Sequence, residues 1–243
     1  MCAIGGAIDM TSFRRPTAVL LTTGNAGRSW TLHRLPASAG LVREVDCPTT
    51  TVCVAVAWTP TATRVRGMTW NDGAGATFPS HIFISKDAGK TWSKARLPKV
   101  EGDVYNLGGL ACPSAEHCLL EGSRTHVEAI PGKFTTIRGT RVYEVGGATL
   151  EAYSLDLRND TVAVRATVRA GGISCVSARR CIMQTWSNPK ALYTSTNAGE
   201  TWRKLAWHIP SNMFIGTLLC VSATSCVVFG GPELATTNDG ARH

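Results

Sequence analysis

Short apolar runs, each bounded by polar turn residues, recur along the whole chain of 243 residues. Typical runs lie at 18–21, 54–57 and 226–230. Runs of this length predict strands, and the glycines and prolines spread between them predict many turns. The runs are far shorter than the roughly 18–20 residues needed to cross a bilayer, so no transmembrane segment is expected. The sequence therefore predicts an all-β globular protein.

Eight of the nine cysteines form four pairs whose members are six residues apart. The pairs are Cys47 and Cys53, Cys112 and Cys118, Cys175 and Cys181, and Cys220 and Cys226. Apolar residues flank each pair, which predicts a strand, a short turn and a strand. Such a hairpin brings two Cα atoms to the roughly 5.5 Å that a disulfide needs, and closing each loop contributes about 2–2.5 kcal/mol. Zinc sites and buried free thiols are the other interpretations, although zinc cysteines usually lie closer together and often occur with histidine.

The ninth cysteine, Cys2, is followed by residues that resemble those after the second cysteine of each pair. We therefore expect Cys2 to be the second cysteine of an incomplete hairpin, so that the chain begins inside a repeat. Disulfides require an oxidising compartment, which predicts an extracellular, periplasmic or cell-surface location. No signal peptide is visible at 1–6.

A second motif, Ser/Thr-x-Asp/Asn-x-Gly-x-Ser/Thr-Trp, begins at Thr23, Ser85 and Ser195, and an incomplete copy begins at Thr236. Its defining positions are Asn25, Gly27, Trp30, Asp87, Gly89, Trp92, Asn197, Gly199, Trp202, Asn238 and Gly240. The pattern predicts a hairpin turn in which Asp or Asn binds backbone N–H groups and Gly takes a positive φ. The tryptophan then starts the next strand.

This motif resembles the Asp-box, or bacterial neuraminidase repeat, of sialidases, sortilin-type receptors, some glycosidases and photosystem II assembly-factor-like proteins. With the cysteine hairpins, the resemblance covers nearly the whole chain. It implies a β-propeller of four-stranded antiparallel blades, in which the motif is structural rather than catalytic. In each blade the cysteine hairpin is expected to join strands one and two, and the Asp-box to join strands three and four.

We expect one propeller domain over 1–243, with four to five blades at about 1–30, 31–92, 93–160, 161–202 and 203–243. The third blade lacks the motif, and 156–160 lies near where the motif is expected. The first blade lacks strand one and the fifth lacks strand four. These ends overlap rather than complement each other, so we expect an incomplete ring. The alternative is a small closed ring with irregular closure.

The net charge of +8 is not gathered into a basic arm and accompanies no recognition helix, so nucleic-acid binding is not expected. A diffuse basic surface attracts anionic polymers instead. Because both repeated motifs are expected at one end of the blades, ligand-binding residues are sought in the loops at the other end. The candidates are Arg14, Arg15, Trp58, Arg64, Arg66, Trp70, Asp72, Trp186 and Lys190. Arginine beside exposed tryptophan suits sugar stacking and carboxylate pairing, and the alternative is ordinary solvated loops.

The resemblance to sialidases implies three arginines for a substrate carboxylate, a tyrosine nucleophile paired with glutamate, and an acidic residue. The segment 13–16, Phe-Arg-Arg-Pro, partly matches the first arginine motif but lies only seven residues before the motif at Thr23. No tyrosine has a nucleophile context and no carboxylate pair suits glycoside hydrolysis. We therefore predict no catalytic residue, no metal and no cofactor. The expected function is non-enzymatic binding of a protein or glycan through the loop face, with an exo-α-sialidase-like hydrolase and a photosystem-assembly-like scaffold as alternatives.

Overall fold

The computed structural model describes residues 2–8, 17–36, 38–58, 64–65, 68–69, 80–98, 103–126, 129–137, 140–145, 148–166, 170–185, 191–206, 217–222, 224–230 and 233–238. Within these residues the regular secondary structure consists of β-strands. No helix of the described part is long and apolar enough to pass through a bilayer. The chain divides into two compact units, one formed by Met1–Leu107 with Ser123–Thr149 and the other by Gly108–Gly122 with Leu150–His243.

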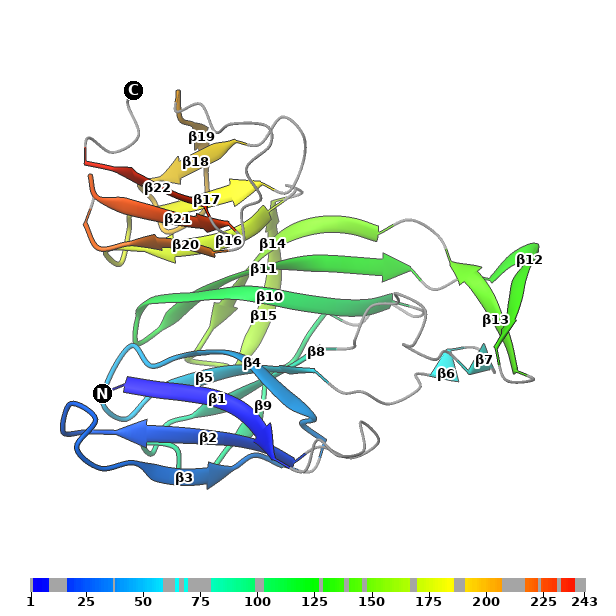
Figure 1. Cartoon of the computed structure of the whole chain (residues 1–243), viewed down its shortest axis with the longest axis horizontal. Helices are drawn as coiled ribbons and strands as arrows, with labels where there is room; N and C mark the ends of the chain where they lie inside the picture. Colours follow the sequence, from blue (N-terminus) through cyan, green and yellow to red (C-terminus); the bar gives the residue numbers. More distant parts are fainter. Residues whose placement is uncertain are drawn as a thin grey trace. The chain divides into compact units, whose positions relative to one another are not determined.

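Five antiparallel sheets follow one another along the chain (Figure 1). The first contains β1 (Cys2–Ile8), β2 (Thr17–Thr23) and β3 (Thr31–Arg34), and the second contains β4 (Leu41–Asp46), β5 (Cys53–Trp58), β8 (Ser80–Ser85) and β9 (Ser93–Lys94). The third contains β10 (Asp103–Ser114), β11 (His117–His126), β14 (Ala148–Asp156) and β15 (Thr161–Ala166). The fourth contains β16 (Ala170–Cys175), β17 (Cys181–Thr185), β18 (Leu192–Ser195) and β19 (Arg203–Lys204), and the fifth contains β20 (Thr217–Cys220), β21 (Cys226–Gly230) and β22 (Glu233–Thr237). The predicted four-stranded antiparallel sheets are confirmed.

Two small hairpins lie within the connections between the second and third strands of a sheet. One is β6 (Arg64–Val65) with β7 (Met68–Thr69), and the other is β12 (Ala129–Ile137) with β13 (Thr140–Val145). In each of the five sheets the strands are adjacent in chain order. The connections at the ends of the second strands are therefore the ones that carry insertions.

Four disulfides hold the first two strands of the second to fifth sheets, and they confirm the predicted pairing. They join Cys47 to Cys53, Cys112 to Cys118, Cys175 to Cys181 and Cys220 to Cys226, with Cα atoms 4.0–4.1 Å apart. The loop between the cysteines is capped by the hydroxyl two residues after the first cysteine. In the fourth sheet, for example, Ser177 Oγ accepts the N–H groups of Arg179 and Arg180 at 3.4 and 3.1 Å.

The cysteine position of the first sheet follows the same register. Cys2 lies opposite Thr23, as Cys53 lies opposite Ser85 in the second sheet. Within the described residues β1 pairs only with β2, whereas β5 is flanked by β4 and β8. Ile4 is 53% exposed, whereas Ala55 at the equivalent position is fully buried. A large apolar side chain is therefore exposed beside the free edge of β1.

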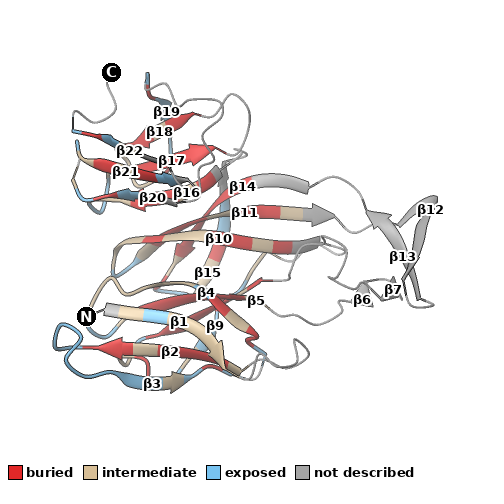
Figure 2. Ribbon diagram, viewed as in Figure 1, coloured by how far each residue is buried: buried red, intermediate tan, exposed pale blue. Residues whose placement is uncertain are grey.

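Within each unit the core clusters lie between the faces of neighbouring sheets, and inner strands such as β5 and β17 are extensively buried (Figure 2). Strand β5 is buried on both faces, since residues 53–57 are all fully buried. In the first unit one core cluster joins the first two sheets and consists of Ala18, Leu20, Leu35, Ala39, Val42, Ala55, Ala57 and Phe83. In the second unit the fourth and fifth sheets share a cluster of Ile182, Leu192, Leu205, Leu218, Cys220, Cys226 and Val228. Burial on both faces explains why these strands are continuous apolar runs rather than alternating ones.

Candidate functional site

The three complete copies of the second motif form the same hydrogen-bonded turn. In the second sheet Ser85 Oγ accepts the N–H of Gly89 at 2.8 Å, and Asp87 Oδ1 accepts the N–H of Thr91 at 2.9 Å. The same bonds recur at 23–29 and 195–201, where asparagine stands in place of aspartate. The motif glycines have φ values of 85–88°, and the alanines before them have φ values of 57–62°. The predicted turn geometry is therefore present, with two consecutive residues in the left-handed region.

Asp87 differs from the two motif asparagines in its charge. The hydroxyl of Thr91 donates to Asp87 Oδ2 at 2.6 Å, and the backbone N–H of Thr91 donates to Oδ1. These hydrogen bonds lower the pKa of the Asp87 carboxyl to about 2 because they favour its charged form. At neutral pH the Asp87 carboxylate is therefore charged and accepts hydrogen bonds within the turn.

The motif tryptophans have a packing role. Trp92 and Trp202 are half-buried and pack against core clusters, and Trp92 Nε1 donates to the carbonyl of Gly89 at 3.1 Å. Trp30 is 41% exposed. Asn238 is exposed at the end of β22, and Gly240 lies outside the described residues.

In three sheets the turn that joins the last two strands is hydrogen-bonded to the cysteine loop of the same sheet, and we call this bond the clasp. The N–H groups of Ala88, Leu157 and Ala198 donate to the carbonyls of Thr51, Glu116 and Arg179 at 2.8, 2.9 and 2.9 Å. Both repeated motifs therefore lie at one end of the sheet, as predicted. Much of the polar turn backbone at this end is already bound within the chain.

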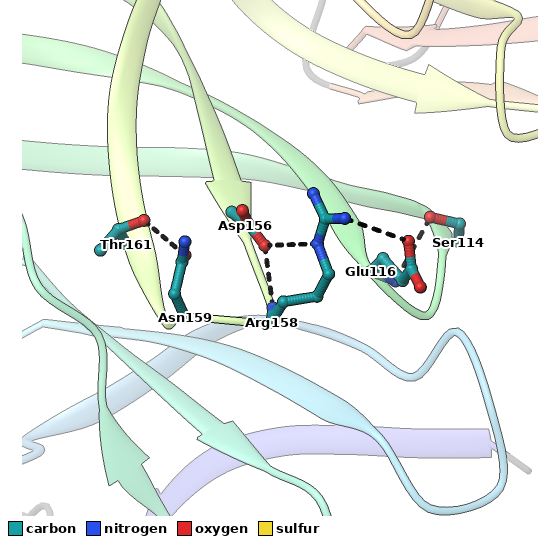
Figure 3. Close-up of polar contacts among 6 residues, drawn as sticks. All are labelled: Ser114, Glu116, Asp156, Arg158, Asn159 and Thr161. Carbon is teal, nitrogen blue, oxygen red and sulfur yellow. Dashed lines mark hydrogen bonds and ion pairs between the residues drawn. The ribbon is translucent and has the colours of Figure 1, made fainter.

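The third sheet has the clasp but a shorter turn. Figure 3 shows polar side chains of this turn together with Ser114 and Glu116 of the cysteine loop. Asp156 pairs with Thr161, so that only 157–160 connect the strands, whereas eight residues separate the paired ends in the second and fourth sheets. Asp156 Oδ1 accepts the backbone N–H of Arg158 at 2.9 Å, which lowers the pKa of the Asp156 carboxyl. The Arg158 guanidinium lies 4.0 Å from Glu116 Oε2, and both side chains are about 70% exposed. An ion pair this exposed contributes well under about 1 kcal/mol, so the turn is held mainly by hydrogen bonds to its backbone.

The opposite end of the second sheet holds Trp58, one of the predicted ligand-binding residues. Trp58 is the last residue of β5, it is half-buried, and it lies opposite Leu41 and Ser80 in the two flanking strands. Its Nε1 donates to the carbonyl of Leu107 at 3.3 Å, and its own carbonyl accepts the N–H of Gly40 at 2.9 Å. The indole is therefore held in place where the long connection between β5 and β8 begins.

A β-bulge places an arginine against this indole. Val42 pairs with Ala57 and Glu44 pairs with Val56, which leaves Arg43 as the extra residue of β4. The Arg43 side chain is exposed, and its guanidinium carbon lies 4.1 Å from the centroid of the Trp58 ring. This is a cation–π contact, and bulges commonly redirect a side chain in this way. Sequence reasoning missed Arg43 because it lies within a strand rather than a loop.

The first strands of the third and fourth sheets carry glycine at the position equivalent to Arg43. Arg43 lies four residues before the first cysteine of its sheet, and the residues at that position in the third and fourth sheets are Gly108 and Gly171. The fourth sheet has its bulge at the same place, because Ala170 pairs with Thr185 and Gly172 pairs with Gln184, which leaves Gly171 as the extra residue. The second and fourth sheets thus share the bulge, and of these two only the second has an arginine there.

The next residue along the first strand also differs between the sheets: it is Gly109 in the third sheet and Glu44 in the second. In the third sheet a Cβ on Gly109 would lie 2.6 Å from Cγ of Glu121, so the glycine makes room for a long side chain on the second strand. In the second sheet the long side chain is Glu44 on the first strand, and Val56 lies opposite. Burial raises the pKa of the Glu44 carboxyl, and the nearby Arg43 charge acts in the opposite direction.

One histidine of the second sheet has an apolar environment. Burial, assisted by the charge of Lys94, lowers the pKa of His81 to about 4. Its ring meets that of Phe83 edge to face at 6.4 Å, and within the described residues its Nδ1 has no hydrogen-bond partner. His81 is therefore neutral at physiological pH and acts as a packing residue.

The side chains of the remaining predicted ligand-binding residues are not among those that the structure describes. Arg64 lies in β6, and only its backbone is described. Outside the described residues lie Arg14, Arg15, Arg66, Trp70, Asp72, Trp186 and Lys190. Among the described side chains no group of three or more His, Cys, Asp and Glu residues could hold a metal ion.

Comparison with known proteins gives the fold. No family model and no curated protein matches the chain. It is similar to the α-L-arabinanase of Penicillium chrysogenum complexed with arabinobiose, at 10% identity and a TM-score of 0.54 over 97% of this chain and 70% of that one. It is also similar to a gluconolactonase of Xanthomonas campestris, at 12% identity and a TM-score of 0.50 over 93% of this chain and 68% of that one. Both are β-propeller proteins.

The chain has a β-propeller fold. It covers 41% of a GH74 enzyme of Niastella koreensis, at 14% identity, a TM-score of 0.45 and 92% of this chain. It covers 62% of YCF48 bound to D1 peptide, at 15% identity, a TM-score of 0.48 and 94% of this chain. The chain thus spans only part of the length of these proteins, and at such identities the likeness concerns the fold alone. In this fold each sheet is a blade, and the stacked Arg43 and Trp58 mark the loop end of the second blade.

Proposed function

We propose that this propeller is an extracytoplasmic binding module that takes a glycan or protein ligand at the loop ends of its blades. The observation that carries the proposal is the stacked pair of Arg43 and Trp58 at the loop end of the second blade. At the other end, the disulfides, turn hydrogen bonds and clasps already engage the polar groups of the turns. A partner is therefore expected to bind at the loop end of the blades.

The cysteine chemistry supports the extracytoplasmic part of the proposal. Four disulfides that each close a short loop are typical of proteins that fold in an oxidising compartment. We also assign the three complete turns to the Asp-box class of repeats. The shared hydrogen bonds and the shared positive φ values of the glycines support that assignment.

The charge supports an anionic ligand. The chain carries 25 Lys and Arg against 17 Asp and Glu, and a net charge of +8 raises the local concentration of anions at the surface. The two side chains at the site, an arginine and a tryptophan, can bind and orient a ligand without cleaving a bond. We therefore propose a non-enzymatic role.

Hydrogen exchange locates the ligand-binding end without a mutation. The full chain is screened on an array of acidic glycans, neutral glycans and extracellular proteins, and exchange is then measured with and without a ligand that binds. We expect slower exchange at the loop ends of β4, β5 and β8. Protection confined to the cysteine loops and Asp-box turns would show that the module binds through its other end.

A hydrolysis assay tests the non-enzymatic part. The full chain and the Arg14→Ala variant are incubated with a fluorogenic sialoside and with fluorogenic arabinoside and glucoside controls. We expect no turnover by either protein. Sialoside turnover that depends on Arg14 would establish the sialidase-like alternative instead.

A further inference from the structure

The exposed apolar side chains of the chain gather on its first and last sheets, and they carry an inference that does not depend on the proposed ligand binding. Seven large apolar residues are exposed within the described part, three at the first sheet, three at the fifth and one, Val164, in the third. The two groups are Ile4, Trp30 and Leu32, and Leu219, Val221 and Phe229, which are 41–72% exposed. Apolar residues gathered in this way mark a surface that another molecule covers.

We propose that the chain associates with itself head to tail, so that the fifth sheet of one copy packs against the first sheet of a second copy. Such a contact is heterologous, because two different surfaces meet. Each copy carries both surfaces, so the smallest closed assembly contains two copies joined by two such contacts. The molecule that covers either end of the chain is therefore the opposite end of the same sequence.

The exposed face of the first sheet carries a row of apolar residues across its three strands. Ile4 lies opposite Leu21, and Leu21 lies opposite Leu32. Residues directly opposite each other share a face of the sheet, and the next residue along a strand points to the other face. Leu20, next to Leu21, belongs to the core cluster that the first sheet shares with the second. The apolar row therefore lies on the face that is turned away from the second sheet.

In the second sheet the equivalent residues are covered by the first sheet. The two registers make Ile4 equivalent to Ala55 and Leu21 equivalent to Phe83. Ala55 and Phe83 are at most 1% exposed, and both belong to the cluster shared with the first sheet. The exposed face of the first sheet is therefore of the kind that packs on a preceding sheet.

The motif tryptophans show the same difference. Trp92 packs against the cluster shared by the first and second sheets, and Trp202 packs against the cluster shared by the third and fourth. Trp30 is the equivalent residue of the first sheet, and it is 41% exposed. Tryptophan is enriched at the centres of protein interfaces, where its loss weakens binding strongly. An exposed indole at the start of β3 thus adds to the apolar row.

The exposed face of the fifth sheet is of the opposite kind. Leu218 and Val228 belong to the core cluster that the fifth sheet shares with the fourth. Leu219, Val227 and Phe229 are their neighbours along the two strands, so they lie on the other face. Leu219 and Phe229 are 50% and 46% exposed, and Val227 is half-buried. This apolar face is therefore turned away from the fourth sheet.

In the fourth sheet the equivalent face is covered by the fifth sheet. Counted from the second cysteine of each sheet, Val227 is equivalent to Ile182 and Phe229 is equivalent to Gln184. Both residues of the fourth sheet are 1% exposed, and Ile182 belongs to the cluster shared with the fifth sheet. The exposed face of the fifth sheet is therefore of the kind that packs on a following sheet.

These two kinds of face are the ones that meet inside the chain. The core clusters of both units join the face of one sheet that receives a following sheet to the face of the next sheet that receives a preceding one. The first sheet and the fifth sheet each expose one member of such a pair. Because both members are exposed in the single chain, a second copy supplies the covering face for each.

The test measures the mass of the oxidised full chain by light scattering and sedimentation equilibrium over a range of concentrations. Leu32→Glu alters the face of the first sheet, and Phe229→Glu alters that of the fifth. Val164→Glu is the matched control, because Val164 is 41% exposed on β15 of the third sheet and the same charge is introduced there. Circular dichroism shows whether each variant is folded, and a non-reducing gel shows whether Cys2 has formed an intermolecular disulfide.

We expect the native chain to associate with a mass of at least two copies and without an intermolecular disulfide. Leu32→Glu and Phe229→Glu should each raise the dissociation constant at least about 10-fold, because a carboxylate would be buried without a partner. An equimolar mixture of these two variants should associate more tightly than either alone, since it contains one intact face of each kind. Val164→Glu should associate like the native chain.

Several outcomes would overturn this inference. A native chain that is monomeric at every concentration, or that is joined only through Cys2, would show that no second copy covers these faces. Native-like association of either Leu32→Glu or Phe229→Glu would show that the two faces do not meet. Equal weakening by Val164→Glu would reduce the effect to the added charge. A mixture of the two variants that associates no better than each alone would exclude the head-to-tail arrangement.

Discussion

Replacing Gly199 by alanine is expected to destabilise the second unit far more than the same change in another copy of the motif. Gly199 has a φ of 85°, and a Cβ added there would lie 2.7 and 2.8 Å from the two terminal carbons of Leu119. Leu119 is 1% exposed within a core cluster that includes Met183, so its side chain has little room to shift. The added methyl group therefore encounters both backbone strain and a steric clash.

The magnitude follows from these two costs. Alanine in the left-handed region costs about 1–2 kcal/mol, and forcing an extra carbon into a packed core costs about 1–3 kcal/mol more. Gly27 has the same φ of 85°, but the closest atoms to its Cβ would belong to Trp30, at 3.8 Å or more. Gly27→Ala should therefore cost only the backbone strain, whereas Gly199→Ala should cost about 2–5 kcal/mol.

The assay is urea unfolding of the oxidised protein, followed by tryptophan fluorescence and far-ultraviolet circular dichroism. A double-mutant cycle with Leu119→Ala isolates the clash within the same unit, because the shortened side chain leaves room for the new methyl group. In the Leu119→Ala background, Gly199→Ala should cost only about 1–2 kcal/mol. The reasoning is refuted if Gly199→Ala costs no more than Gly27→Ala and the cycle gives no coupling between positions 119 and 199.

Three further predictions concern the turn end of the blades. The pKa of Asp87 is about 2 in the folded protein and about 3.9 in an unfolded chain, so its contribution to stability is present above about pH 4 and is lost as the pH falls toward 2. Asp87→Asn, which copies the asparagine of the other two motifs, should therefore flatten the acid side of the stability profile measured by urea unfolding between pH 2 and 6, and an unchanged profile would contradict the assigned hydrogen bonds. Replacing both Cys175 and Cys181 by serine should lower the free energy of unfolding by about 2–2.5 kcal/mol, the entropy of one seven-residue loop. Thiol titration of the denatured, unreduced native protein should find one free thiol, that of Cys2, and a count of nine would contradict the disulfides.

Local patterns in the sequence were enough to predict the frame of each blade. The six-residue cysteine spacing and the motif around Asp87 are complete within a few residues, so the disulfides and turns could be derived before the strands were placed. The order of strands followed from them, because each pattern joins two consecutive strands. The predicted all-β fold of four-stranded antiparallel sheets is accordingly confirmed.

The candidate site could not be predicted in the same way. Trp58 was identified from its place before a long connection, but its partner Arg43 lies in a strand whose register is shifted by one residue. A bulge depends on how two strands pair, and neither strand shows it alone. The other predicted residues of the loop face lie outside the described residues, apart from the backbone of Arg64, so their roles stay predictions.

The clasp has a consequence for how far the blades can diverge in sequence. Its donor is a main-chain N–H, which every amino acid except proline provides. Ala88, Ala198 and Leu157 can therefore make the same bond, although the turn around Leu157 is four residues shorter and has lost the motif glycine and tryptophan. Side chains at these turns are free to change one blade at a time, and proline at 88, 157 or 198 is the substitution that the architecture forbids.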